Sequence, residues 1–411
     1  MSFGEHGVRS SWIWILAIFT LASFVDAGFY GQINAFTPLH LTAMGLPPDQ
    51  VTSYTGLLAA LTWAVGIPFL PVWGALADRY ARQPVIARSF LAFLVAGLFM
   101  LVARDVWLFG VGRAIMSLAL GNSGLMMTTL SECVPQKRMG VAFAIMNSAA
   151  PIGYFTAPLI GGPVVDRWGF SALLLISMGL VLVVTLLVAF GYHDPYKGTT
   201  AEPLWRMVRD SVTILVRTPS ILKLFGAMFV LFVGWQAVIP YIPLITTSIY
   251  HGPNPAAVVG EVVGIGGLLV IIVGPATGAL ADHFGRWRVL FVAAGVSAVF
   301  LPLPLLAHSL VGIALAWSAA NGVMSGVLAL SFTVLSDTVT DEIRGRVMSF
   351  SWLPLNLSAT AGPLVGSIVA DHSVWWLFPV ASMLTIAGIV VFALVFLQVR
   401  RPAIKSAAVQ A

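Results

Sequence analysis

Two charged side chains stand inside long apolar runs of this 411-residue chain. Asp26 lies within SFVDAGFYGQINAF (23–36), and Arg113 lies within LFGVGRAIMSLALG (108–121). A charge at the centre of a lipid bilayer costs about 3 kcal/mol on insertion scales, so an ionisable group there marks a proton, ion or substrate site by default. We therefore predict a proton-coupling role for Asp26 and Arg113. A purely structural ion pair is the alternative.

The expected depths of the two charges allow them to meet. At 1.5 Å per residue, Asp26 lies roughly 16 Å and Arg113 roughly 10 Å from the same end of their predicted helices. An acid that gains a proton loses its attraction for a nearby arginine. We therefore expect proton binding by Asp26 to weaken its contact with Arg113 and so to drive a change of state.

Polar and aromatic side chains accompany these charges on several apolar segments. Tyr30 lies one helical turn from Asp26 and shares its face. Taken singly, each polar residue is explained equally well by a hydrogen bond between helices, and each Trp by anchoring at the membrane surface. Together they form a predicted substrate cavity, whose residues are Tyr30, Gln32, Asn34, Phe36, Asn122, Asn147, Trp235, Gln236, Tyr241, Asn321, Trp352 and Asn356.

The elements that position these residues are predicted to be membrane-spanning helices. Hydrophobic residues make up 59% of the chain and charged residues only 9%, against roughly 25% charged in soluble domains. Runs such as 173–190 are apolar on every face, which argues against the alternating strands of a β-barrel. We predict an all-α fold with twelve transmembrane helices, at 12–37, 51–72, 85–103, 106–131, 140–164, 170–191, 220–249, 259–280, 289–307, 310–335, 345–369 and 375–398.

The basic residues predict the orientation of these helices. With the N-terminus in the cytoplasm, Arg104 and Arg167 fall outside, Arg113 falls within a span, and the remaining Lys and Arg residues fall on the cytoplasmic side. We expect a multi-pass protein of the inner or plasma membrane with both termini cytoplasmic. The net charge of +5 then belongs to the inner membrane face and gives no reason to expect nucleic acid as a partner.

The chain repeats itself at an interval of 204 to 205 residues. GALAD occurs at 74–78 and 278–282, Glu132 matches Asp337, and the position matching Asp26 is Leu231. The repeat predicts two pseudo-symmetric six-helix halves, 1–191 and 220–411, joined by a cytoplasmic linker at 192–219. Within the linker, 204–216 reads either as an amphipathic interfacial helix or as a loosely ordered segment. Because the repeat does not require an acid at position 26, a functional role for Asp26 is favoured.

This organisation resembles the major facilitator superfamily over about residues 12–398. The gating motif that carries the resemblance is G-x-L-x-D-R-x-x-R after the second helix, although Ala81 and Gln83 depart from the usual residues. The resemblance implies a charge cluster that gates the cytoplasmic seam between the halves, and a simple positive-inside anchor is the alternative. The gating residues of the two copies are Gly74, Asp78, Arg79, Arg82, Gly278, Asp282 and Arg286.

Two further motifs resemble those of proton-coupled exporters in this superfamily. Residues 153–162 resemble G-x-x-x-G-P-x-x-G-G, with Ala157 replacing one glycine, and a plain packing face is the alternative. The resemblance adds Pro158, Gly161 and Gly162 to the gating residues, as a segment that seals the outer end of the cavity. In the fourth helix, only Arg113 and the later Gly121 carry over.

These features predict a secondary active transporter that works by alternating access and functions as a monomer. We expect a proton-coupled exporter of small organic or amphipathic compounds, similar to the drug:proton antiporter group. A sugar or other polar-solute exporter or symporter, a lipid transporter and a non-transporting receptor remain as alternatives. No G-x-x-x-x-G-K-[ST] motif occurs and no two of the seven His residues are at ligand spacing, so we expect no enzyme activity, cofactor or metal.

Overall fold

The computed structural model describes residues 11–192, 194, 205, 206, 209, 213, 218–307, 309–339, 347, 348 and 350–409. For Asp78, Leu268 and residues 399–409 it describes the backbone alone. Most of the predicted linker at 192–219 lies outside the described residues, and of the segment 204–216 only 205, 206, 209 and 213 are described. The predicted domain boundaries therefore stay a prediction.

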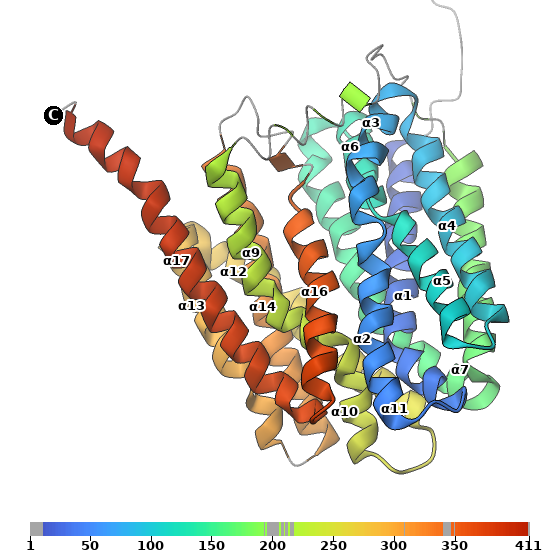
Figure 1. Cartoon of the computed structure of the whole chain (residues 1–411). Coiled ribbons are helices and arrows are strands. Elements are labelled where there is room, and N and C mark those ends of the chain that lie inside the picture. Colours follow the sequence, from blue (N-terminus) through green and yellow to red (C-terminus); the bar gives the residue numbers. More distant parts are fainter. Residues whose placement is uncertain are drawn as a thin grey trace, which may run out of the picture.

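The described chain forms a bundle of helices that run between two ends of the molecule (Figure 1). The first half, which we call the N-half, contains α1(Trp12–Ala43), α2(Pro48–Ala64), α3(Leu70–Arg79), α4(Arg82–Val102), α5(Val106–Met116), α6(Asn122–Cys133) and α7(Met139–Phe190). The second, the C-half, contains α9(Pro219–Val238), α10(Ile242–Ile249), α11(Pro255–Gly266), α12(Leu268–Phe284), α13(Arg286–Phe300), α14(Leu310–Thr338), α16(Leu353–Ala370) and α17(Leu377–Val409). Short 3₁₀ helices connect several of them, at η1(Ile67–Phe69), η2(Ser117–Ala119), η3(Gln136–Arg138), η4(Ile239–Tyr241), η5(Leu303–Leu306) and η6(Val374–Trp376).

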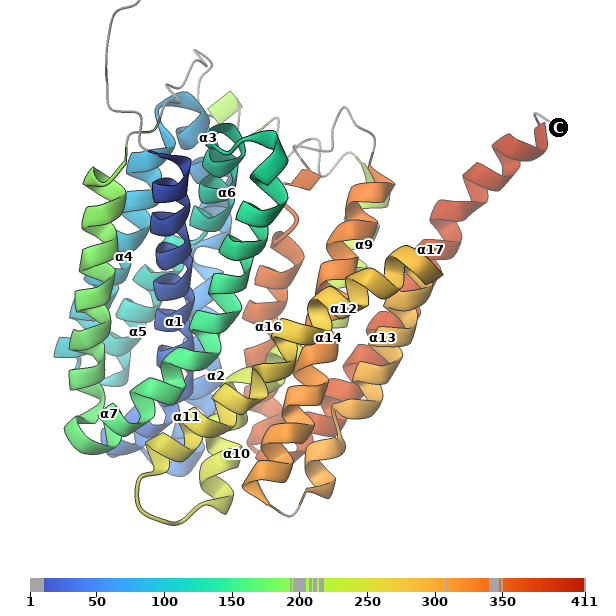
Figure 2. The same cartoon turned by 180° about the vertical axis from the view of Figure 1, so that it is seen from behind.

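The helices account for the twelve predicted crossings. Ten segments of the described chain are long and apolar enough to cross a membrane. One of them, Gln136–Phe190, has 55 residues, or about 82 Å at 1.5 Å per residue, and contains the non-helical Gly169 (φ 80°, ψ 169°). It turns back there and crosses twice, as Figure 2 shows for α7. The remaining crossing is the fourth, which is split between α5 and α6. The twelve-helix fold is therefore confirmed.

Several crossings are broken at proline or glycine. The second breaks between α2 and α3 at Gly66 and Pro68, and the seventh breaks between α9 and α10 at Pro240. In the fourth, Leu120 is extended and Gly121 takes a left-handed conformation (φ 96°). Backbone groups freed at such breaks must find partners inside the protein, because the bilayer offers none. The breaks therefore lie where other helices can bond to them.

Each half buries a hydrophobic core of its own. In the N-half, Phe19, Phe90 and Phe109 are completely buried, and in the C-half Phe232 and Phe392 are completely buried in a separate cluster. The core residues come almost entirely from helices of the same half. The halves are therefore two packed units, each stabilised from within.

The two halves meet near one end of the bundle. We call the end that carries the α3–α4 turn and η3 the basic end, and the other the opposite end. Near the opposite end, α7 packs on α11 and α2 packs on α16, with Gly162 against Ala256, Gly260 against Pro158 and Gly56 against Pro363. No side chain beyond glycine fits at these three glycines. Toward the basic end the helices of the two halves diverge (Figures 1 and 2).

Candidate functional site

Asp26 lies halfway along α1 and is held by a neutral amide. Its side chain is 9% exposed, and its Oδ2 accepts a hydrogen bond from Nδ2 of Asn122 (3.1 Å). The other carboxyl oxygen, Oδ1, is buried without a hydrogen-bond partner among the described residues. The site therefore leaves one carboxyl oxygen available for a proton.

The break in the fourth crossing places Asn122 opposite Asp26. Asn122 is the first residue of α6 and follows the left-handed Gly121. The first N–H groups of a helix have no partner within it and carry a partial positive charge, which favours an anion nearby. Asp26 is therefore approached by both the amide and the positive end of α6.

Groups from two neighbouring crossings bond to this break. Arg88 of α4 donates through Nη1 to the carbonyl oxygen of Leu118 (2.7 Å), and its guanidinium carbon lies 3.5 Å from the ring centroid of Trp73 in α3. The N–H of Gly66, at the break of the second crossing, donates to Ser117 Oγ (2.6 Å). These contacts join the helix of the gating motif to the turn that carries Asn122.

Arg113 is buried in a separate network. It is 1% exposed, donates through Nε to the Leu58 carbonyl (3.1 Å) and through Nη2 to Asn34 Oδ1 (2.9 Å). Asn34 in turn donates to the hydroxyl of Tyr154 (3.3 Å), and Arg113 Nη1 has no hydrogen-bond partner among the described residues. No ion pair joins Arg113 to Asp26 in the described chain, so the pairing suggested by their similar depth is not formed here.

Tyr30 lies near both charges. Its ring stacks on Trp63 at a centroid distance of 5.3 Å and an angle of 10°, and meets Phe93 edge-on at 5.3 Å. Its hydroxyl donates to the Met116 carbonyl at the end of α5 (3.4 Å). An aromatic wall therefore stands beside Asp26.

The other predicted cavity residues of the N-half lie apart from Asp26. Gln32 donates to the Ala157 carbonyl (3.2 Å) and accepts from Ser177 (2.5 Å), so both ends of its amide are used in packing α1 against α7. Phe36 is completely buried beside Gly161. Asn147 is exposed on α7.

In the C-half, two predicted residues form a pair at a helix break. Trp235 donates through Nε1 to Asn321 Oδ1 (2.9 Å), and Asn321 donates to the carbonyl of Gly266 (3.0 Å), where α11 ends. Tyr241 instead lies in the contact between the halves, where its hydroxyl is 3.4 Å from the Thr52 carbonyl of α2 and 3.2 Å from the Pro363 carbonyl of α16. Tyr241 is therefore part of the closed end rather than of a cavity wall.

The remaining three predicted cavity residues of the C-half lie in three different environments. Trp352 is 53% exposed and packs against Phe332 at a ring distance of 5.0 Å. Asn356 is buried within α16, and Gln236 lies beside Gly362. These contacts do not bring the three side chains together at one place.

Arginines of the gating motif form an ion pair within each half. Arg82 pairs with Glu132 (2.7 Å), and Arg286 pairs with Asp337 at the equivalent place in the repeat. Each pair ties the start of one crossing to the end of the next within the same half. A Cβ added at Gly74 or Gly278 would meet nothing within 4 Å, so neither glycine makes a close contact with another helix in this conformation.

Three other gating residues lie at the basic end. Arg79 is half-buried with its guanidinium carbon 5.4 Å from the ring centroid of Tyr80, and Asp282 is exposed. The side chain of Asp78 lies outside the part of the chain that the structure describes. The predicted seam between the halves at this end is therefore untested.

The start of α4 is also tied to the end of α7. Gln83, which stands where the motif usually has a basic residue, donates to the carbonyls of Val188, Ala189 and Tyr192 (3.1, 2.9 and 2.9 Å). Burial raises the pKa of the Tyr192 phenol above its usual range, and the nearby Asp194 carboxylate adds to this. The neutral phenol ring packs edge-on against Phe19 of α1 at a centroid distance of 5.2 Å.

Two aspartates reach across the closed opposite end. Asp166 of α7 accepts hydrogen bonds from the N–H groups of Ala256 and Ala257 at the start of α11 (3.0 and 2.7 Å). Asp371, which follows α16, accepts one from Ser53 of α2 (3.2 Å). We call these two contacts the aspartate clasp. Asp166 and Asp371 occupy equivalent positions in the repeat, and each aspartate bonds to a residue of the other half.

Sequence reasoning missed several of these residues. Tyr154 stood inside the quoted fifth-helix motif, and Asp166 matched Asp371 in the repeat, so both had a signal. Arg88 was counted only as a basic residue near the membrane surface. Glu261, which is exposed in the middle of α11, is a second acid within a predicted span. No group of three or more potential metal ligands occurs among the described residues.

The chain is similar to known membrane transporters in sequence and in fold. The chain is 24% identical over 365 residues to a multidrug resistance protein MdtG of Salmonella dublin, covering 88% of this chain and 90% of that protein, and 24% identical over 406 residues to MdtG of Klebsiella pneumoniae, covering 96% and 95%. Among solved structures, the POT family transporter PepTSo matches with a TM-score of 0.76 at 13% identity over 94% of this chain and 98% of that one.

A D-xylose-proton symporter matches with a TM-score of 0.72 at 14% identity, over 92% of this chain and 97% of that one. At such identities the solved structures support the fold alone. The family model described as Major Facilitator Superfamily matches residues 16–302 and 224–411, which is most of the chain. The protein is therefore a multi-pass membrane transporter rather than an enzyme, and it belongs to the Major Facilitator Superfamily.

Proposed function

We propose that this transporter exports small amphipathic organic compounds in exchange for protons. The observation that carries the proposal is the environment of Asp26, a buried carboxyl with one neutral hydrogen-bond donor and one oxygen without a partner. An intramembrane carboxyl without a cationic partner is costly when charged, so it favours binding a proton whenever a proton is within reach. The multidrug resistance proteins among the relatives support the same class of cargo.

The arrangement supplies a sequence of steps for exchange. When the interior faces the opposite end, Asp26 takes up a proton at its free oxygen. When the halves rock and the interior faces the basic end, the proton leaves and the amide of Asn122 and the N-terminus of α6 stabilise the carboxylate. Arg113 remains positive throughout, because a guanidinium group is not deprotonated in proteins, and Asn34 and the Leu58 carbonyl hold it in place. Its fixed charge favours release of the proton.

The chemistry of the walls restricts the cargo. The stacked rings of Tyr30 and Trp63 offer faces that attract aromatic and cationic groups. A binding site built around one acid and one base would not suit a phosphate or a dicarboxylate. The amide of Gln32 is used in packing, which removes one contact that a sugar would need. We therefore favour neutral or cationic amphipathic compounds over polar solutes.

The state of this structure fits export. With the basic end in the cytoplasm, as the distribution of Lys and Arg favours, the halves are closed toward the outside and diverge toward the inside. Both termini are then cytoplasmic, in the inner or plasma membrane of the cell. The opposite end is closed by contacts between the two halves of a single chain. We therefore propose that the transporter functions as a monomer.

The first test measures proton movement in energised everted vesicles. Tetraphenylphosphonium, a neutral dye and a sugar are added in turn to vesicles that contain the normal protein, Asp26→Asn or the control Asp105→Asn. We expect the lipophilic compounds to release protons only where Asp26 is present, while Asp26→Asn still equilibrates the compound. Full coupling in Asp26→Asn would exclude this mechanism. Full coupling in the Asp105→Asn control is required, since that acid lies at the opposite end.

The class of cargo is tested at Trp235. Trp235→Ala leaves Asn321 bonded to Gly266 but removes the ring. We expect reduced transport of several structurally unrelated compounds. Reduced transport of one polar solute alone would favour the sugar or polar-solute transporter instead. Activity that needs lipid cargo and ignores the proton gradient would favour a lipid transporter.

A further inference from the structure

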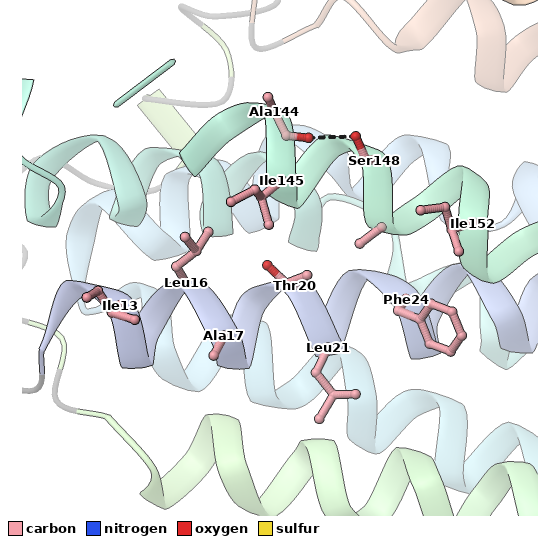
Figure 3. Close-up of a pocket in the computed structure, with 11 residues that line it drawn as sticks. Ile13, Leu16, Ala17, Thr20, Leu21, Phe24, Ala144, Ile145, Ser148 and Ile152 are labelled. Carbon is pink, nitrogen blue, oxygen red and sulfur yellow. Dashed lines mark hydrogen bonds between the residues drawn. The ribbon is translucent and has the colours of Figure 1, made fainter. Parts of the chain in front are cut away.

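A groove of about 860 Å³ runs between α1 and the first limb of α7. Its walls include Ile13, Ala17 and Phe24 on α1 and Ile145 and Ile152 on α7 (Figure 3). No charged side chain lines it. The chemistry of the walls therefore suits a hydrocarbon chain.

The groove is a wedge with a closed floor. Beyond Phe24 the two helices are in backbone contact, because Gly153 lies against the Phe24 carbonyl, Gly31 against the Tyr154 carbonyl and Gly28 against Ala157. Toward the basic end the helices separate. The groove therefore opens at that end and stops before it reaches the depth of Asp26.

The length of the wedge matches one leaflet of a bilayer. From Ile13 to Phe24, α1 rises roughly 16 Å at 1.5 Å per residue. Half of a hydrocarbon core of about 30 Å is about 15 Å. A single acyl chain that entered from the basic end would reach the floor.

The groove lies on the outer surface of the N-half. Ile13 is 59% exposed and Ile145 is 46% exposed. On the helical wheel of α1, Ile13, Ala17 and Phe24 lie on roughly the opposite face from Asp26. In Figure 2, α1 stands between the two limbs of α7 on the near side of the molecule. The groove therefore faces the lipid rather than the cargo site.

Polar groups mark the groove and its mouth. Thr20 lines the groove and its hydroxyl oxygen is buried without a hydrogen-bond partner among the described residues, whereas Ser148 bonds back to its own helix at Ala144 (2.8 Å). Lys137 and Arg138 of η3 are exposed and precede the first groove residue of α7 by about two turns, or roughly 10 Å. Basic groups between membrane helices at a bilayer surface are suited to anionic headgroups.

We propose that the groove is a binding site for an anionic phospholipid, with one acyl chain between α1 and α7 and the headgroup phosphate at Lys137 and Arg138. The bound chain fills the wedge that the splayed helices leave. It is distinct from the transported compound, which belongs to the other face of α1. The site is independent of whether the transporter is coupled to protons.

The test measures lipid binding by native mass spectrometry, with the normal protein released from nanodiscs of equal phosphatidylglycerol and phosphatidylcholine. We expect retained phosphatidylglycerol in preference to phosphatidylcholine. Lys137→Gln with Arg138→Gln should reduce this preference about 30-fold, from the attraction of two basic residues to an anionic headgroup. Arg288→Gln, at the basic end of the C-half, is the matched charge control and should keep the preference.

The apolar part of the site is tested by filling it. Ala17→Phe should reduce retained lipid of both kinds at least tenfold, whereas Val299→Phe on the exposed side of α13 should not. Unchanged lipid retention in Ala17→Phe would overturn the proposal. So would equal losses in each variant and its control, because the retained lipid would then be ordinary bilayer lipid bound without a specific site. Loss of tetraphenylphosphonium binding in Ala17→Phe with lipid unchanged would make the groove a cargo site and also overturn it. The charge variants do not alter packing, so they test the site even where Ala17→Phe fails to fold.

Discussion

Removal of Asp166 is expected to shift the balance between the two states of the transporter. Among the described residues, only the side chain of Asp166 caps the start of α11. Asn254, the residue that precedes this helix, is left-handed and its side chain makes no capping bond. A lost side-chain cap costs about 1 to 2 kcal/mol. Because the cap crosses between the halves, this energy is lost only from the state that is closed at the opposite end. Asp166→Ala should therefore favour the other state by roughly 5- to 30-fold.

Pulsed electron paramagnetic resonance measures this shift directly. Spin labels on cysteines introduced at Gln136 and His283, both exposed at the basic end, report the separation of the halves there once Cys133 is replaced by serine. We expect Asp166→Ala to increase the population at the shorter distance by that factor. Asp105→Ala is the matched control, since Asp105 caps α5 within one half through the Leu108 N–H (2.9 Å). An unchanged distance distribution in Asp166→Ala, or an equal change in the control, would refute the role of the clasp.

Three further substitutions test the site and the packing. Asn122→Ala removes the one donor to the buried carboxyl of α1, and we expect drug-dependent proton release in vesicles to fall about tenfold, from one lost hydrogen bond to a charged group. Gly162→Val places a side chain against the backbone of α11 and should abolish transport by forcing the closed end apart, whereas Gly179→Val meets nothing within 4 Å and should transport normally. Arg82→Gln should lower the free energy of unfolding by about 2 kcal/mol, because the Arg82 side chain is only 5% exposed, and Arg286→Gln should lower it by less, because the Arg286 side chain is 42% exposed and its ion pair is screened by solvent. Equal melting temperatures for the last two would contradict this difference.

The periodic and compositional signals of the sequence were sufficient for the fold. Apolar runs of membrane length, the basic loops and the repeat at 204 to 205 residues predicted twelve helices in two related halves, because these features depend on the bilayer and on local sequence. Segment ends were less predictable. The crossing predicted at 12–37 continues to Ala43, and those at 140–164 and 170–191 join through Gly169.

The partners of the site residues could not be predicted in the same way. They are set by contacts between residues far apart in the chain, and the spacing of residues along the sequence does not determine these contacts. Asp26 and Arg113 were placed at similar depth, but their partners were decided by helix rotation and by the break at Gly121, which brings Asn122 rather than Arg113 to the acid. Gln32 and Tyr241 carried the right chemistry for a cavity, yet both are used in helix contacts. A polar side chain in a membrane helix reveals that it needs a partner, but not whether the partner is another helix or a cargo.

The separate cores of the two halves have a consequence for assembly. Each half buries its own aromatic residues and forms its own ion pair at the basic end, while the contacts between the halves include close-packed glycines, one tyrosine and the two aspartates of the clasp. A polypeptide cut within 195–204 and made as two coexpressed fragments should therefore insert as two folded units, which then find each other in the membrane. If the two fragments together restore transport, the affinity of one half for the other can be measured as a binding constant between two separate polypeptides.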